Sequence, residues 1–552
     1  MEYTGAEIVL NCLKEQRVDT IFGYPGGAVI PLYDALFNYH HDFLHVLTCH
    51  EQGAIHAADG YARSTGKAGV CFATSGPGAT NTVTGIATAY MDSVPLVVFT
   101  GQVPQSLLGR DSFQEIDITA VTFPITKYNY LVKSVEYLPS IIREAFSTAM
   151  SGRKGPVLID IPKNIFTAKG EYISASRLME RKKSSPVDDS LLWEVVEAID
   201  ASEKPVIYAG GGVIHAGAEP ELWELATKAS IPVANTLMSL GCFPMDHPLS
   251  LGLVGMHGHK ETNLAVMESD LIIAVGARFS DRVIGTKDKF APGAKIIHID
   301  IDGSEIGKNK EVHFPLEGNV KDTLRALADK VGEKDRSQWL SSIRSLAPKG
   351  KRHPDAFSPA NILALAQGIV GKDSIIVTEV GQHQMWAAQY CKVDSPRRFL
   401  TSGGLGTMGY GLGASIGAQI ANPDKKVLHI AGDGSFRMNC NELATVSKYK
   451  LPIITLLFNN GSLGMVRQWQ GLFQEKRYSQ TDLTDDVDYM TLASAYRLNG
   501  AKAENLVQLG EALFKAIDSK KATIIECMID KETGVYPIVP PGMPINNMIT
   551  GS

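Results

Sequence analysis

The chain has 552 residues, too many for one hydrophobic core, and domains of about 100–200 residues would divide it into roughly three. Its hydrophobic content of 44% and charged content of 20% are ordinary for a globular protein. The net charge of −6, without a cluster of basic and aromatic residues, argues against a nucleic-acid-binding protein.

The cysteines and the N-terminal residues favour a cytoplasmic protein. The seven cysteines are scattered and form no CxxC pair, which is typical of reduced, mostly buried thiols. The opening residues Met1-Glu-Tyr-Thr4 have neither the basic nor the apolar region of a targeting peptide, and the longest apolar runs are shorter than a membrane span. We therefore expect a soluble protein without a membrane segment.

Residues 1–176 predict a first α/β domain, because short apolar segments alternate with amphipathic helical stretches. Glu51 comes just before the predicted helix Gln52–Arg63, so its carboxylate either favours the helix dipole or has a chemical role. The glycine-rich turn Thr74–Asn81 either connects a strand tightly to a helix or lets the backbone approach a ligand. The strands are predicted at Thr20–Gly23, Val70–Ala73, Leu96–Thr100 and Val157–Ile161.

Residues 190–335 predict a second α/β domain, between a charged linker at Arg177–Asp189 and another linker at residues 335–357. Gly210-Gly-Gly212 follows one predicted strand and Gly276 follows another. A plain turn explains one such run, whereas several of them at one sheet edge favour a ligand site. The strands are predicted at Pro205–Ala209, Pro232–Ala234, Leu271–Val275 and Lys295–Ile299.

Residues 356–552 predict a third α/β domain in which polar residues follow two strands. Gly432-Asp433-Gly434 ends the apolar segment Lys426–Ala431, and Asn459-Asn460 ends the segment Ile453–Phe458. A helix is predicted between them at Asn439–Lys448. Each cluster alone is typical of a turn, but ligands of open α/β sheets bind where parallel strands end. Asp433 and Asn460 offer the oxygen ligands that Mg²⁺ prefers, and the start of a helix suits a diphosphate.

The predicted fold class is therefore α/β, with three doubly wound parallel-sheet domains. The paired Gly-Asp-Gly and Asn-Asn spacing resembles the thiamine-diphosphate motif. Nearly the whole chain resembles the catalytic large subunits of the acetohydroxyacid synthase (acetolactate synthase) family. The motifs that carry the resemblance are Gly23-Tyr-Pro-Gly-Gly27, His50-Glu51, Ser75–Asn81, Ala89–Pro95, Phe113-Gln-Glu115, Ile161-Pro-Lys163, Gly255-Met-His-Gly258, Arg278–Arg282, Gly403–Gly409 and Leu463–Trp469.

The resemblance implies a pyrimidine-binding, a central FAD-binding and a diphosphate-binding domain, in that order. Glu51 would activate the aminopyrimidine of thiamine diphosphate by acid–base catalysis. Asp433, Asn460 and the carbonyl of Ser462 would bind Mg²⁺. Gly406 would accept a hydrogen bond from the pyrimidine amino group, and Met408 would bend the cofactor into a V shape. Further implied contacts of this cofactor are Gly381, Gln382, His383, Gly432, Gly434, Ser435 and Met465.

The resemblance also implies an FAD without a net redox role in the central domain. Its contacts would be Gly210, Gly211, Gly212, Thr236, Leu237, Met256, His257, Gly258, Gly276, Arg278, Asp300 and Ile301. One departure from the family pattern is Asn319, where Asp is common.

The implied reaction is decarboxylation of pyruvate and transfer of the hydroxyethyl unit to a second pyruvate or to 2-oxobutanoate, the first common step of valine, leucine and isoleucine biosynthesis. Arg282 offers a bidentate fork for a carboxylate. Trp469 either forms an apolar wall that favours 2-oxobutanoate or is a core aromatic at helical spacing. By resemblance, Gln114 and Lys163 would join Glu51 as catalytic residues, and Phe113 and Val466 would contact the substrate.

The family implies a homodimer or a dimer of dimers, because Glu51 and the metal ligands would come from different subunits. A separate regulatory small subunit is also implied. Three alternatives stay open at this point: an FAD- and thiamine-dependent pyruvate oxidase, a catabolic acetolactate synthase without FAD, and a non-catalytic paralogue. The catabolic enzyme would lack the Gly-Met-Val-Arg-Gln-Trp run, and the paralogue would be expected to lose Glu51 or a metal ligand.

Overall fold

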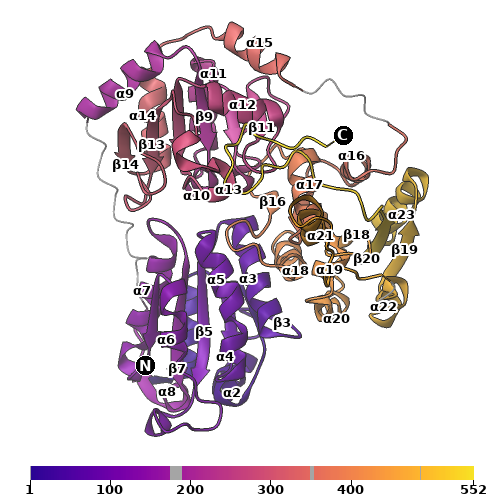
Figure 1. Ribbon diagram of the computed structural model, residues 1–552. Helices are drawn as coiled ribbons and strands as arrows, with labels where there is room; N and C mark the ends of the chain where they lie inside the picture. Colours follow the sequence, from indigo (N-terminus) through magenta and orange to yellow (C-terminus); the bar gives the residue numbers. More distant parts are fainter. Residues whose placement is uncertain (1, 175–188, 348–353, 485–486, 552) are drawn as a thin grey trace.

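The computed structural model describes residues 2–174, 189–347, 354–484 and 487–551, and these residues form three six-stranded parallel sheets (Figure 1). The predicted fold class is thereby confirmed. No helix among the described residues is both long and apolar enough to cross a membrane.

The N-terminal sheet has the strand order β3-β2-β4-β5-β7-β6. Its strands are β2 (Thr20–Gly23), β3 (Leu44–Leu47), β4 (Gly69–Ala73), β5 (Leu96–Gln102), β6 (Tyr128–Leu131) and β7 (Pro156–Pro162). A short antiparallel pair, β1 (Glu2–Thr4) and β8 (Lys169–Glu171), accompanies it. The helices are α1 (Gly5–Glu15), α2 (Ile30–Asn38), α3 (Glu51–Thr65), α4 (Pro77–Asn81), α5 (Val83–Met91), α6 (Ile118–Thr122), α7 (Leu138–Met150) and α8 (Lys163–Thr167).

The central sheet has the order β11-β10-β9-β12-β13-β14, which is the 3-2-1-4-5-6 order of dinucleotide-binding sheets. Its strands are β9 (Pro205–Ala209), β10 (Val233–Asn235), β11 (Ser250–Leu253), β12 (Leu271–Val275), β13 (Lys295–Asp300) and β14 (Phe314–Glu317). Its helices are α9 (Asp189–Ala201), α10 (Gly211–Ala216), α11 (Glu219–Lys228), α12 (Lys260–Glu268), α13 (Asp281–Ile284), α14 (Val320–Lys330) and α15 (Ser337–Ser345).

The C-terminal sheet has the order β16-β15-β17-β18-β20-β19, which repeats the 2-1-3-4-6-5 order of the N-terminal sheet. Its strands are β15 (Ile375–Thr378), β16 (Phe399–Leu400), β17 (Val427–Gly432), β18 (Ile454–Asn459), β19 (Asn499–Ala503) and β20 (Thr523–Met528). Its helices are α16 (Pro359–Val370), α17 (Gln382–Tyr390), α18 (Gly411–Ala421), α19 (Asp433–Phe436), α20 (Leu443–Lys448), α21 (Gly464–Phe473), α22 (Tyr489–Ala495) and α23 (Leu506–Ser519).

Two predictions of local structure need correction. Residues 335–357 are not simply a linker, because α15 lies within them and buries Trp339 and Ile343, four residues apart on one helix face, in the core of the central domain. The helix predicted at Asn439–Lys448 is a 3₁₀ turn at Cys440–Glu442 followed by α20. The linker predicted at Arg177–Asp189 lies outside the described residues except for Asp189, where α9 begins.

The N- and C-terminal domains share one hydrophobic core, and α3 lies directly against α18 (Figure 1). Glycine allows this approach, because a Cβ on Gly417 would lie 1.8 Å from the carbonyl oxygen of Ala57. A Cβ on Gly60 would lie 2.1 Å from the carbonyl oxygen of Ala414. The two helices therefore pack backbone against backbone, which fixes the first domain relative to the third.

Candidate active site

The predicted ligand loops follow the strands at which the order of each sheet reverses. In the C-terminal sheet the switch lies between β15, which leads to Gly381, and β17, which leads to Asp433. In the central sheet it lies between β9, which leads to Gly210, and β12, which leads to Gly276. The crevice at such a switch point is where open α/β sheets bind ligands.

The metal-binding candidates converge on one backbone amide. An oxygen of the Asp433 carboxylate and the amide oxygen of Asn460 each accept a hydrogen bond from the Ser462 N–H, both at 3.1 Å. Burial raises the pKa of Asp433 to about 6, because the carboxylate has lost its hydration. No cluster of three or more metal-ligating side chains occurs among the described residues. This sparse oxygen set fits Mg²⁺, which takes few protein ligands and completes its shell with phosphate and water.

The start of α17, next to these residues, offers free hydrogen-bond donors. Gly381 is its N-cap and provides no side-chain cap. His383 is buried, and its Nε2 has no hydrogen-bond partner within the described part of the chain. Burial lowers the pKa of His383 to about 4, so the ring is neutral at pH 7. Gln382 accepts a hydrogen bond from the Asn460 side chain at 3.2 Å, which joins this helix to the metal-binding candidates. The arrangement fits a diphosphate.

Glu379 holds the surrounding loops together, and the sequence prediction missed it. Its carboxylate accepts hydrogen bonds from the Gly409 N–H at 2.9 Å, the Ser435 hydroxyl at 2.7 Å and the Leu412 N–H at 3.0 Å. Burial alone would raise the pKa of Glu379, but the adjacent His429 ring and Ser435 hydroxyl hold it below the ordinary value. A buried, ionised carboxylate thus connects the loops that carry Gly381, Met408 and Asp433.

A cavity of about 2170 Å³ adjoins this region. All the predicted flavin contacts line it except Gly258, and so do Gly381, Gly406, Met465, Arg282 and Trp469. Packing also requires glycine at position 210, because a Cβ there would lie 2.1 Å from the carbonyl oxygen of Gly276. Burial raises the pKa of Asp300, on the cavity wall, to about 6.

Asn319, the departure from the family pattern, caps α14 and also lines this cavity. Its side-chain oxygen accepts hydrogen bonds from the Lys321 and Asp322 N–H groups. Asn and Asp are comparable N-caps, so the departure leaves the local fold intact.

The two substrate candidates on the cavity wall differ in exposure. The Arg282 side chain is 63% exposed and makes a 3.8 Å ion pair with Asp281. Trp469 packs edge-on against Phe473, with ring centroids 5.7 Å apart, and its Nε1–H has no acceptor among the described residues. Trp469 packs on a helix neighbour and also lines the cavity, but it is only partly buried and is not a core aromatic, and its role in substrate choice stays a prediction. Val466 is exposed and does not line the cavity.

The candidates on the N-terminal domain lie elsewhere, because none of Glu51, Phe113, Gln114 and Lys163 lines this cavity. Glu51 is buried at the first turn of α3 and accepts a hydrogen bond of 2.9 Å from Asn81, a second residue that the prediction missed. Phe113 is 87% exposed, the neighbouring Gln114 has a left-handed backbone, and Lys163 begins α8.

Within one chain, Glu51 does not line the cavity that the loop with Gly406 lines. That loop is bonded to Asp92, which pairs with Arg63 near the C-terminal end of α3. Glu51 is at the other end of α3, and at 1.5 Å per residue it lies about 18 Å from Arg63 along the helix axis.

Three models of thiamine pyrophosphate enzymes match the chain: the N-terminal binding domain over residues 3–121, the central domain over 192–327, and the C-terminal binding domain over 379–527. The chain is 46% identical to the probable acetolactate synthase large subunit of Methanocaldococcus jannaschii, over 99% of this chain and 95% of that protein. It is 45% identical to the isozyme 2 large subunit of Escherichia coli, over 99% of both. For the acetolactate synthase large subunit of Lactococcus lactis, the identity is 43% over 99% of this chain and 96% of that protein.

The chain belongs to the acetolactate synthase large-subunit family. The family resemblance, the three-domain fold and the assignment as a thiamine-diphosphate-dependent enzyme are confirmed. The roles of individual residues, the metal ion and the flavin are not tested by these similarities and stay predictions.

Proposed function

We propose that this acetolactate synthase family member decarboxylates pyruvate and transfers the hydroxyethyl unit to a second pyruvate or to 2-oxobutanoate. The observation that carries the proposal is the shared cavity, on whose wall Arg282 and Trp469 lie together with Gly381 and Gly406. A guanidinium and an apolar wall are the two groups needed to recognise a 2-oxo acid, one for its carboxylate and the other for its alkyl chain.

Thiamine diphosphate, when bound, would supply a nucleophilic carbon for addition to the carbonyl of pyruvate and a positively charged ring that stabilises negative charge on that carbon. Asp433, Asn460 and the Ser462 carbonyl would hold Mg²⁺ against the diphosphate, and the start of α17 would donate hydrogen bonds to it. Gly406 and Met408 would orient the pyrimidine. Glu51 would exchange a proton with the pyrimidine ring nitrogen.

The central domain would hold FAD. The support is its dinucleotide-type strand order, the cavity lined by Gly210–Gly212 and Gly276–Arg278, and Asp300 at the end of β13 as an acceptor for ribose or adenine. We propose that the flavin has no net redox role in the reaction.

The active unit would be a homodimer or a dimer of dimers. The support is that Glu51 does not line the cavity on whose wall Gly406 lies, so a second copy would supply one of the two. The relatives are named large subunits, which supports a separate regulatory small subunit. All seven cysteines are free thiols, which suits a cytoplasmic enzyme.

The test is acetolactate formation from pyruvate under nitrogen, with the flavin spectrum recorded during turnover. The proposal predicts product with the flavin remaining oxidised. Bleaching of the flavin by pyruvate, with turnover only when an electron acceptor is added, would identify a pyruvate oxidase instead. Arg282→Ala should reduce product formation, whereas Arg477→Ala, an equally exposed arginine away from the cavity, should not.

A further inference from the structure

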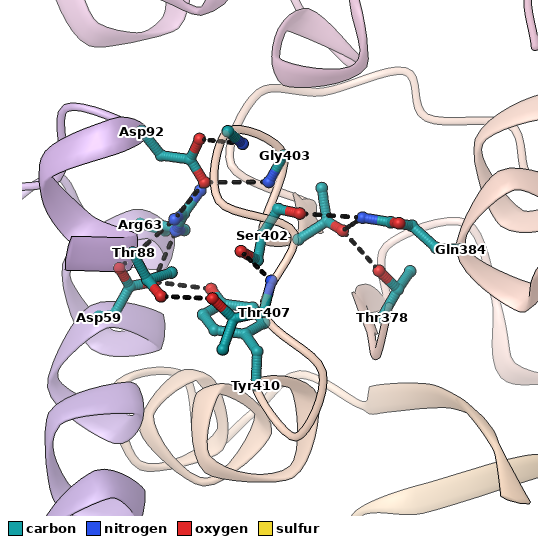
Figure 2. Close-up of polar contacts among 12 residues, drawn as sticks. Asp59, Arg63, Thr88, Asp92, Thr378, Gln384, Ser402, Gly403, Thr407 and Tyr410 are labelled. Carbon is teal, nitrogen blue, oxygen red and sulfur yellow. Dashed lines mark hydrogen bonds and ion pairs between the residues drawn. The ribbon is translucent and has the colours of Figure 1, made fainter. Parts of the chain in front are cut away.

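The loop Ser402–Gly409 carries Gly406 and Met408, and its first half is held by the N-terminal domain of the same chain. The buried Asp92 carboxylate accepts hydrogen bonds from the Gly403 N–H at 3.0 Å and the Gly404 N–H at 2.7 Å (Figure 2). Asp92 follows α5, whereas the loop precedes α18, so this contact joins the first and third domains.

Asp92 belongs to a cluster of charged side chains with Arg63 and Asp59, and these side chains are at most 9% exposed. Arg63 on α3 pairs with Asp92 at 2.9 Å and with Asp59 at 2.6 Å, and the Tyr410 hydroxyl donates to Asp59 at 2.7 Å (Figure 2). Burial alone would lower the pKa of Arg63, but the adjacent Asp59 and Asp92 carboxylates raise it above the ordinary value. Arg63 is therefore permanently charged.

Besides Arg63, the two carboxylates accept hydrogen bonds from neutral donors. The donors are the Gly403 and Gly404 N–H groups and the Tyr410 hydroxyl, all from the C-terminal domain. A buried charge without such donors is strongly destabilising, so the loop amides are constrained to stay where Asp92 places them.

The rest of the loop is held at other points. The Thr407 N–H donates to the Ser402 hydroxyl at 3.0 Å, and the hydroxyls of Thr88 and Thr407 lie 2.7 Å apart (Figure 2). Gly409 is bonded to Glu379. Leu405 and Gly406, between these anchors, are exposed toward the cavity, and Gly406 has φ +67°.

We propose that Asp92, held in place by Arg63, is a positioning residue for this loop and sets the orientation of the pyrimidine that Gly406 and Met408 contact. Asp92, Gly403 and Gly404 also line the cavity assigned to the flavin, so the same carboxylate positions part of the wall of that cavity. The inference rests on the proposed function, because it assumes that thiamine diphosphate binds this loop.

The test compares Asp92→Asn with Asp270→Asn. Asp270 is a matched control, because its carboxylate also accepts hydrogen bonds from two consecutive backbone amides, those of Glu203 and Lys204, but far from the loop. The readouts are amide hydrogen exchange of residues 401–411 in the cofactor-free protein, exchange of the thiazolium C2 proton in the loaded enzyme, and turnover.

The Asp92→Asn variant should still bind the cofactor. Its Gly403 and Gly404 amide protons should exchange with solvent faster than the same protons in the Asp270→Asn variant. It should also slow C2 proton exchange and turnover by roughly 10- to 10²-fold, since a misplacement of about 1 Å can cost that much. Asp92→Glu should restore part of the C2 exchange rate. If Asp92→Asn does not fold, Thr88→Val removes one anchor without disturbing the charges and should show the same effects at smaller size.

The inference is overturned if both Asp92→Asn and Thr88→Val exchange the loop amides and the C2 proton at the rate of the wild type. This outcome differs from failure of the proposed function. In that case the wild type itself would form no acetolactate, and the loop exchange of the cofactor-free protein would still respond to Asp92→Asn.

Discussion

The N- and C-terminal sheets have the same strand order, but the loops at their carboxyl edges differ in how complete a site they form. In the C-terminal domain, Asp433, Asn460 and Gln382 are buried and connected by hydrogen bonds. In the N-terminal domain, Phe113 is almost fully exposed and none of the candidates reaches the cavity. Under the proposed function, the loops of the C-terminal domain would form the cofactor-binding half within one chain, whereas the N-terminal candidates would act on the site of a second copy.

The largest expected effect comes from removing the proposed metal ligand Asp433 from the C-terminal domain. Asp433→Ala should abolish activity, because Mg²⁺ and with it the diphosphate lose their only protein carboxylate among the proposed ligands. The measurement is cofactor affinity by fluorescence quenching at several Mg²⁺ concentrations. Asp373→Ala, at an exposed aspartate before β15, is the control. Unchanged affinity in Asp433→Ala would reduce Asp433 to a turn residue.

Glu51→Gln tests the proposed catalytic residue of the N-terminal domain. The variant should bind thiamine diphosphate but lose turnover by about 10²–10⁴-fold, the usual contribution of general acid–base catalysis, because an amide cannot exchange the required proton. The hydrogen bond between residue 51 and Asn81 can persist with glutamine, so thermal stability should change little. Acetolactate formation near the wild-type rate would contradict the assigned role.

Trp469→Leu addresses substrate choice on the cavity wall. One methylene in an apolar pocket is worth roughly 1–3 kcal/mol, so the preference for 2-oxobutanoate should fall by about tenfold or more while acetolactate formation continues. Arg282→Ala should lower both products, because each acceptor carries the carboxylate. Both acceptors should be supplied in competition. An unchanged product ratio in Trp469→Leu would make this residue part of the packing only.

The smallest effect on activity is expected at Asp160, where the change is in the pH dependence of stability. Asp160 on β7 accepts hydrogen bonds from Thr100 and Gln102, and Gln102 also donates to the carbonyl of Ile116, beside Gln114. Burial raises the pKa of Asp160 from 3.8 to about 7. Because the folded-state pKa is the higher one, this group stabilises the fold fully below pH 3.8, and that contribution is lost as the pH rises through about 7.

Asp160→Asn should therefore flatten the fall in unfolding free energy between pH 3.8 and about 7. The difference is at most about 4 kcal/mol, from 1.36 kcal/mol per pKa unit. Denaturant unfolding at a series of pH values measures it. Parallel pH profiles for the wild type and the variant would show that Asp160 does not titrate in this range.

The parts predicted well from the sequence are those encoded locally. The strands around Asp433 and Asn460 follow from apolar runs that end in turn residues, and their functional meaning follows from a spacing motif. Trp339 and Ile343 lie among Ser, Arg and Lys residues, and this polar composition predicts a linker where α15 forms. Asp92 and Glu379 act through backbone amides of other loops, and no pattern in the sequence reports such partners. What the sequence does offer is position: Asp92 lies within the motif Ala89–Pro95, and Glu379 lies two residues before Gly381.

The central claim is that each site combines the two halves from different copies of the chain. It is tested most directly by coexpressing Glu51→Gln with Asp433→Ala, each inactive alone, and assaying acetolactate formation by the purified mixture. A mixed dimer would contain one site with native residues in both halves, so random pairing should restore about a quarter of the wild-type activity. If the mixture stays as inactive as the separate variants although mixed dimers are isolated, both halves must come from one chain, and the account is wrong.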